Sequence, residues 1–293
     1  MSARRLHVLC NPTAGGGRGA RALAAVEAAL GGHGIEVVVE RSDSHEHAVA
    51  LARAAAASGA EVVAFGGDGM VRLVAHEVRH SDATLGILPG GRGNDFAARL
   101  GIPRDPIAAC ALLVDGATRT IDVGDADGET FVGVASIGLE SEVTRLANAA
   151  PRIGGRAVYA GAMVVGLARW RPATFVLEVD GEPQRVTGFL AAAANSGRFG
   201  GGMRIAPDAA LDDGLLDLVV IEHGTRRRFL RNAPKVFTGR HVHEPDIRVL
   251  RAREVRMDAD RPFEVYADGD PIARTPAVVR AVPAALAVIA PPE

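Results

Sequence analysis

Short apolar runs alternate with amphipathic stretches along the first 120 residues of the chain. The apolar runs have strand length and occupy residues 6–10, 35–40, 61–65 and 84–88. Between them, apolar residues recur at helical spacing, as in Leu23, Val26 and Leu30 and again in Val71, Val74 and Val78. Regular alternation of strand and helix predicts a parallel sheet with right-handed crossover connections.

The pattern changes after a helix that is marked at both ends. Asp105 suits the N-cap, Pro106 suits the first helical position, and Gly116 ends the segment. From Gly124 onward, strand-like runs separated by Gly, Asp and Pro predominate, with helical patterns only at about 141–170 and 225–238. We therefore expect an α/β domain over residues 1–124 and a mostly antiparallel β domain over residues 125–293.

Composition limits the partners and the cellular location expected for this protein. Of 293 residues, 48% are hydrophobic and 23% charged, and a net charge of -2 gives no global attraction to nucleic acid. Cys10 and Cys110 have no C-x-x-C partner, which favours a reducing, cytoplasmic location. The longest apolar stretch, residues 157–168, is too short to span a bilayer, so membrane contact is expected to be peripheral, at the inner face.

Two glycine-rich runs carry the strongest chemical signal. Gly66-Gly67-Asp68-Gly69 and residues 90–94 each follow a predicted strand and precede a helical pattern. Such a turn brings bare backbone and a helix N-terminus to an anion. An aspartate inside the turn repels phosphate unless a cation stands between them, which points to a nucleotide with magnesium. Plain turn geometry is the competing interpretation. Lys235 is the only lysine and is followed by Val236, which excludes the Walker P-loop.

Other patterns support rival readings. Residues 15–20 fit G-x-G-x-x-A, with Glu40 ending the next strand, as in a Rossmann dinucleotide site; Asn11-Pro12-Thr13, however, separates the strand from these glycines. His45, His47, His241 and His243 lack metal-site spacing and are expected in surface loops. The basic segment at 226–231 either docks an anionic membrane or forms a solvated helix face.

Taken in order, several segments resemble the diacylglycerol kinase catalytic family, which includes bacterial lipid kinases and sphingosine kinases. The matching segments are Asn11-Pro12, Gly66 to Gly69, Gly90 to Phe96, Ile121-Asp122, Asn195 to Pro207, Asp213-Gly214-Leu215 and Asp268-Gly269-Asp270. The resemblance implies an NAD kinase-like α/β nucleotide-binding domain followed by a β-sandwich domain, with the last strands at 277–290 returning toward the first. It also implies a lipid kinase that uses ATP and Mg²⁺ and acts on a lipid at the membrane surface. A nucleic-acid partner is not expected, in line with the net charge, and homodimer formation stays open.

The resemblance also implies residue roles. The nucleotide-binding residues would be Asn11, Ser42, Gly66, Gly67, Asp68, Gly69, Gly90, Gly91, Arg92, Gly93 and Asn94. Asp68 would act near the transferring phosphate, and Asp270 would be the proton acceptor. The metal ligands would be Asp213 with the carbonyls of Ala210 and Leu215 at a structural magnesium site, and Asp95 and Asp122 near the phosphates.

Three residues depart from the family pattern. Met70 and Arg92 stand where threonine is usual, and Asp270 replaces glutamate. Met70 removes a hydroxyl, whereas Arg92 adds a charge that could bind phosphate. These changes bear on nucleotide selection more than on the reaction class. The alternatives are NAD kinase-like phosphorylation of a soluble nucleotide, a Rossmann-type oxidoreductase, and a non-catalytic nucleotide-binding regulator.

Overall fold

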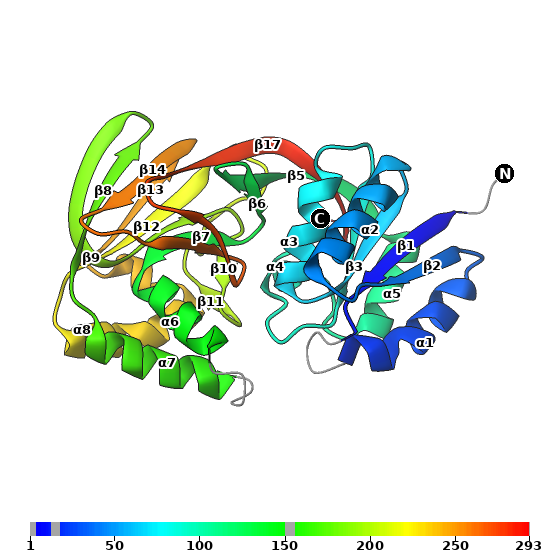
Figure 1. Cartoon of the computed structure of the whole chain (residues 1–293), viewed down its shortest axis with the longest axis horizontal. Helices are drawn as coiled ribbons and strands as arrows, with labels where there is room; N and C mark the ends of the chain where they lie inside the picture. Colours follow the sequence, from blue (N-terminus) through cyan, green and yellow to red (C-terminus); the bar gives the residue numbers. More distant parts are fainter. Residues whose placement is uncertain (1–3, 13–17, 150–155, 293) are drawn as a thin grey trace. The chain divides into compact units, whose positions relative to one another are not determined.

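The computed structural model describes residues 4–12, 18–149 and 156–292 (Figure 1). The chain forms two compact units. Unit 1 comprises Met1–Asp122 and Ala284–Glu293, and unit 2 comprises Val123–Pro283. Among the described residues, no helix is both long enough and apolar enough to cross a membrane.

Unit 1 is a parallel α/β structure, as the alternation of apolar runs predicted. Its elements are β1 (Arg5–Cys10), α1 (Arg18–Gly31), β2 (Glu36–Arg41), α2 (His45–Ala57), β3 (Glu61–Gly66), α3 (Asp68–Val78), β4 (Thr84–Pro89), α4 (Asp95–Arg99) and α5 (Pro106–Asp115). The strands pair in the order β4-β3-β1-β2, all parallel, and the end of β17 (Ala277–Ala290) joins β4 through Val288 and Leu85. Their carboxyl ends therefore lie at one edge of the sheet.

The helices of unit 1 cover the sheet with the apolar faces that the sequence marks. Leu23, Val26 and Leu30 of α1 are buried, as are Val71 and Val74 of α3. Helix α1 packs against α5, and α2 packs against α3 (Figure 1). Asp105 caps α5 by accepting the Ile107 N–H at 3.2 Å, which confirms the predicted start of that helix.

Unit 2 is a β-sandwich with helices packed against it. Its elements are the end of β5 (Ala117–Ala126), β6 (Glu129–Phe131), β7 (Val134–Gly138), α6 (Leu139–Asn148), α7 (Arg156–Arg169), β8 (Ala173–Val179), β9 (Glu182–Ala194), β10 (Arg198–Phe199), β11 (Met203–Arg204), β12 (Leu216–Glu222), α8 (Arg226–Asn232), the 3₁₀ helices η2 (Ala233–Thr238) and η3 (Arg240–His243), β13 (Ile247–Ala252), β14 (Glu254–Ala259), β15 (Glu264–Ala267), β16 (Asp270–Arg274) and the start of β17. The strand pairs within this unit are antiparallel.

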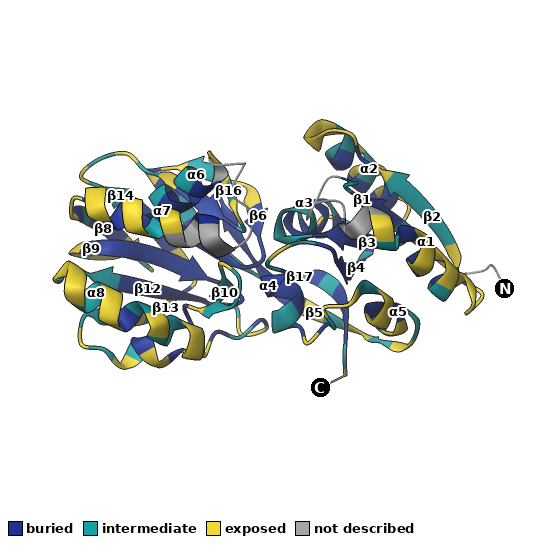
Figure 2. Cartoon of the chain, turned by 90° about the horizontal axis from the view of Figure 1, so that it is seen from below, coloured by how far each residue is buried: buried dark blue, intermediate teal, exposed yellow. Residues whose placement is uncertain are grey.

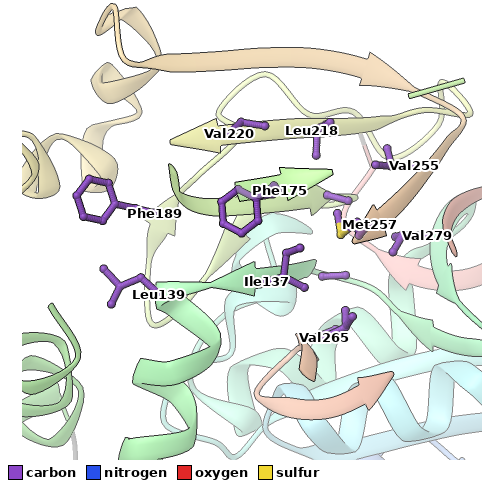
Figure 3. Packing of buried hydrophobic residues seen from close by; sticks show 14 of the residues in the cluster. Ile137, Leu139, Phe175, Phe189, Leu218, Val220, Val255, Met257, Val265 and Val279 are labelled. Carbon is purple, nitrogen blue, oxygen red and sulfur yellow. The ribbon is translucent and has the colours of Figure 1, made fainter. Parts of the chain in front are cut away.

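The core of unit 2 is filled by side chains from several strands and from helices α6 and α7. Strand β9 pairs with β8 along its first half and with β7 along its last residues, and buried side chains of all three strands belong to one cluster. Figure 3 shows Phe175 of β8 and Ile137 of β7 in this cluster, with Met257 of β14 nearby. Burial alternates along β8, as expected for a strand with one face on the core. The neighbouring strand β9 is drawn largely in the dark blue of buried residues in Figure 2, because its second half is buried on both faces.

The prediction that the histidine pairs lie in surface loops is wrong. His45 and His47 lie in the first turn of α2, where Ser44 accepts the His47 N–H at 3.0 Å. His241 is buried in η3, and its Nε2 lies 3.0 Å from the Ile205 carbonyl oxygen. Burial lowers the pKa of His241, because desolvation disfavours the charged imidazolium.

Candidate active site

The two glycine turns leave the same edge of the unit 1 sheet and are bonded to each other. Strands β3 and β4 pair in register as far as Gly66 and Pro89. The N–H groups of Gly90 and Gly91 then both donate to the Gly66 carbonyl, at 2.8 and 3.1 Å. The two turns therefore form one backbone-bonded unit at the carboxyl ends of the strands.

Glycine is required here because the turns touch backbone to backbone. A Cβ atom placed on Gly91 with ideal geometry would lie 2.3 Å from the Cα of Gly67. A Cβ on Gly67 would lie 3.1 Å from the Cα of Gly91, and one on Gly93 would lie 2.8 Å from Oδ2 of Asp68. The glycines of these runs thus serve close packing of the turns as well as any approach of a ligand.

Asp68 fastens the second turn to the first. Its Oδ2 accepts the Asn94 N–H at 2.9 Å, and its Oδ1 accepts the Phe96 N–H at 3.1 Å. Asn94, in the left-handed region at φ 56°, in turn accepts the Gly91 N–H at 2.9 Å and donates to the Gly91 carbonyl at 3.1 Å. A single carboxylate therefore sets the shape of the segment that begins α4.

The surroundings of Asp68 disfavour the ionised form of its carboxylate. Burial raises its pKa, and the neighbouring Asp95 carboxylate raises it further, while N–H groups of Phe96, Asn94 and Asp95 act in the opposite direction. Two carboxylates in one buried corner repel each other. A proton or a cation beside Asp68 and Asp95 would relieve that repulsion.

The remaining nucleotide-site candidates of unit 1 lie at the same edge. Asn11 follows β1 directly, and Ser42 follows β2, with its N–H donating to the Cys10 carbonyl at 3.1 Å. Ser42 is buried and Asn11 partly so. Helix α3 begins at Asp68 with no side chain capping its N-terminus. The glycines of the rival dinucleotide motif at positions 15–17 lie outside the described residues.

Asp122 occupies the point where the chain leaves unit 1. It is buried, and its Oδ1 accepts the N–H of Ala284 at 2.8 Å, where the chain re-enters the same unit. This contact joins residues 162 positions apart. Asp122 therefore closes unit 1 by tying its exit to its re-entry.

In unit 2, Asp270 begins β16 directly after a tight turn. Asp268 and Gly269 both have positive φ, at 53° and 95°, as in a type I′ hairpin. Oδ2 of Asp268 accepts the Val132 N–H at 2.9 Å, and a Cβ on Gly133 would lie 2.2 Å from Oδ1 of Asp268. The turn that presents Asp270 is thus seated on Val132-Gly133.

Asn195 supports that seat and was not assigned a role from sequence. It is fully buried, and its Nδ2 donates to the Val132 carbonyl at 3.1 Å. The N–H groups of Asn195 and Ser196 donate to the Gly133 carbonyl at 2.9 and 3.1 Å. The sequence analysis included Asn195 and Asp268 in segments that resemble the family. Only their hydrogen-bond partners show that they hold Val132-Gly133 and the turn before Asp270 together.

At the expected structural magnesium site, both carboxylate oxygens of Asp213 already have partners within the protein. Oδ1 of Asp213 accepts the Leu215 N–H at 3.0 Å, and Oδ2 pairs with the Arg251 guanidinium. Ala210 lies in the same loop and is partly buried. Across the described part of the chain, His, Cys, Asp and Glu side chains do not gather in threes in a way that could hold a metal ion.

The basic segment at 226–231 divides between packing and exposure. Arg228 pairs with Asp246 at 3.0 Å, and Arg226 donates to the Trp170 carbonyl at 3.2 Å. Arg227 and Arg231 are exposed, and so is Leu230. Two of the arginines therefore hold α8 in place.

Comparisons with known proteins agree with this architecture. Residues 5–126 match the diacylglycerol kinase catalytic domain, and residues 133–290 match the YegS C-terminal NAD kinase beta sandwich-like domain. The chain belongs to this family of kinases and is an ATP-dependent lipid kinase.

Two curated relatives and one solved structure illustrate the likeness. A diacylglycerol kinase of Mycobacterium tuberculosis is 38% identical over 295 residues, covering 98% of this chain and 95% of the relative. A diacylglycerol kinase of Bacillus subtilis is 30% identical over 275 residues, covering 91% and 90%. The crystal structure of a diacylglycerol kinase from Bacillus anthracis has a TM-score of 0.81 and 24% identity, covering 99% and 97%, and supports the fold alone.

Proposed function

We propose that this kinase phosphorylates diacylglycerol, with the ATP phosphates bound at the paired glycine turns and Asp270 as proton acceptor. The observation that carries the proposal is the unit made by the two turns, which Asp68 and the Gly66 carbonyl hold together at the carboxyl edge of the sheet. The two relatives described above are named diacylglycerol kinases, which supports this acceptor.

The phosphate site is supported by the helix that follows the first turn. Helix α3 has 11 residues and no side-chain cap, so its first N–H groups and dipole suit an anion. Arg92 is exposed in the second turn and forms no ion pair with the described residues. Its guanidinium would add a charge-assisted contact to a phosphate oxygen.

Asp95 and Asp68 would hold the magnesium ion that accompanies ATP. The fit rests on their mutual repulsion, which raises the pKa of Asp68 and which a divalent cation would offset. Asp213 fits this role less well, because its carboxylate already pairs with the Arg251 guanidinium. When bound, the metal would supply neutralisation of phosphate charge.

In the proposed reaction the lipid hydroxyl oxygen attacks the γ-phosphorus, and the bond between that phosphorus and the β,γ-bridging oxygen breaks, releasing ADP. The hydroxyl proton passes to the Asp270 carboxylate. Positioning supplies most of the acceleration in such transfers. The anchoring of Asp268 on Val132-Gly133 supports a fixed place for Asp270.

An acceptor screen tests the substrate. The purified protein with ATP and Mg²⁺ is offered diacylglycerol, phosphatidylglycerol or sphingosine in mixed micelles, or NAD in solution, and the phosphorylated product is identified. We expect phosphatidate from diacylglycerol. Phosphorylated NAD would instead establish the NAD kinase-like reaction, and ATP turnover that ignores every lipid would refute the proposal.

The twin hairpin provides a control for Asp270. Asp180-Gly181-Glu182 has the same positive-φ turn, and Asp180 likewise accepts backbone N–H groups, those of Arg253 and Glu254 at 2.9 Å. Asp270→Asn should lower kcat by about a hundredfold or more, since general acid–base groups contribute on that order. Glu182→Gln should leave it unchanged. Equal activity of both variants would remove Asp270 from the mechanism.

A further inference from the structure

A cavity of about 510 Å³ opens in unit 2 between the start of α6, the end of α7 and the segment around β15. Its lining is rich in arginine: Arg145, Arg169, Arg171, Arg261 and Arg274, against two glutamates, Glu142 and Glu264. The rings of Trp170, Phe263 and Tyr266 complete the wall. Neither glycine turn contributes to it.

Two of the arginines build the cavity and are not available to a ligand. Arg145 is bonded to Glu142 through Nη2 at 2.6 Å, which neutralises one of the two glutamates. The Arg261 guanidinium lies 5.2 Å from the ring centre of Trp170 and 5.1 Å from that of Phe263. It also donates to two main-chain carbonyls of the segment after α7.

The other three guanidinium groups of the cavity have no side-chain partner among the described residues. Arg169 ends α7, Arg171 follows it and Arg274 ends β16; all three are exposed and bond to no side chain of the described residues. Glu264 accepts the Tyr266 hydroxyl at 3.3 Å. Three exposed guanidinium groups without a side-chain partner in the described part of the chain line one cavity, which suits an anion with several oxygens.

Trp170 forms part of the cavity wall through its ring. The residue is 7% exposed, and its Nε1–H is buried without an acceptor among the described residues. Because that nitrogen is buried, it does not contact an occupant of the cavity; the ring, over which the Arg261 guanidinium lies, is the part of Trp170 that a bound ligand would affect.

The surroundings favour a lipid over a free anion. On α7, Val164 and Val165 are 65% and 39% exposed, and Val165 lies one turn before Arg169. Exposed aliphatic residues beside cations and amphipathic rings are characteristic of a protein face at a membrane–water interface. A soluble phosphate would use the arginines and leave the valines without a role.

We propose that this cavity binds the phosphate group of an anionic phospholipid, with Arg169, Arg171 and Arg274 around the headgroup and Val164 and Val165 against the acyl region. This site is separate from the proposed phosphoryl-transfer residues. It would hold the kinase on an anionic membrane through a lipid that is not consumed.

Trp170 supplies the readout, because it is the only tryptophan of the chain. Its fluorescence is titrated, without ATP, with phosphatidylcholine vesicles, with vesicles that also contain phosphatidylglycerol, and with inorganic phosphate. We expect a saturable spectral change only with phosphatidylglycerol. Arg169→Gln/Arg274→Gln should weaken this binding about thirtyfold, the contribution expected from two arginines at an anionic surface.

The control is Arg240→Gln/Arg256→Gln, which removes the same charge from exposed positions of unit 2 outside the cavity. It should bind like the parent. If the double cavity variant does not fold, Arg274→Gln alone should weaken binding about fivefold. Equal loss in the control, no spectral change with phosphatidylglycerol, or equally tight binding of inorganic phosphate would each overturn the proposal. Because no turnover is measured, these outcomes do not depend on the identity of the acceptor.

Discussion

Gly91→Ala should separate the shape of the two turns from the stability of the protein. The added Cβ would lie 2.3 Å from the Cα of Gly67, about 1.1 Å short of the 3.4 Å at which ordinary contact begins. It would also lie 2.9 Å from Oδ1 of Asn94, the atom that holds the Gly91 N–H. The Gly67 Cα belongs to the backbone, and the Asn94 amide is held by two hydrogen bonds to Gly91, so one turn must move by roughly 1 Å.

Two effects of different size follow. Overpacking of this kind costs about 1–3 kcal/mol, which in a chain of this size lowers Tm by only a few degrees. A displacement of about 1 Å at a phosphate site costs on the order of a hundredfold in rate. We therefore expect kcat/KM for lipid phosphorylation to fall about a hundredfold while the melting transition remains cooperative.

The assay measures product formation and thermal unfolding on the same samples. Gly67→Ala, whose Cβ would lie 3.1 Å from Gly91, should be milder than Gly91→Ala. Gly31→Ala is the matched control, since nothing lies within 4 Å of its Cβ, and it should keep full activity. A Gly91→Ala enzyme as active as the parent would refute the argument that turn packing sets the site.

Three further predictions address other parts of the chain. Burial raises the pKa of Glu140. The stability gained from its protonated form is therefore present at low pH and lost as pH rises through that pKa. Glu140→Gln should show a smaller fall in Tm from pH 5 to pH 8 than the parent, measured by thermal unfolding. Gly133→Ala should displace Asp268 and lower kcat with little change in KM for ATP, and a change confined to that KM would contradict the placing of Asp270. Arg92→Gln should raise KM for ATP about tenfold, the loss expected for one charge-assisted contact, measured by initial rates.

Sequence predicted the parts of the fold that local chemistry determines. The helix capped by Asp105 begins and ends where its N-cap, proline and glycine indicated. The burial of single residues was harder to predict from sequence. His241 lies in a polar, histidine-rich stretch, yet it is buried, and its ring contacts Ile205, which is distant in sequence. Its burial depends on this tertiary contact, which the local sequence pattern does not contain.

The candidate site shows the same division. Spacing and glycine content identified both turns, and the family resemblance named Asp68 and Asp122. The partners of these aspartates are backbone N–H groups far along the chain, 26 positions on for Asp68 and 162 for Asp122. Because every residue but proline carries an N–H, sequence offers no marker for such a partner, and a carboxylate that shapes backbone looks the same as one that binds metal.

Strand β17 imposes an order on biosynthesis. It pairs with β14 of unit 2 through residues 277–280 and supplies buried Leu286, Val288 and Ile289 to unit 1, where Val288 pairs opposite Leu85. A nascent chain that has emerged only as far as residue 122 still lacks this strand, and Asp122 still lacks the N–H it accepts. Unit 1 can therefore mature only after unit 2 has been synthesised, and a ribosome that stalls before residue 284 leaves unit 1 with an open sheet edge beside β4.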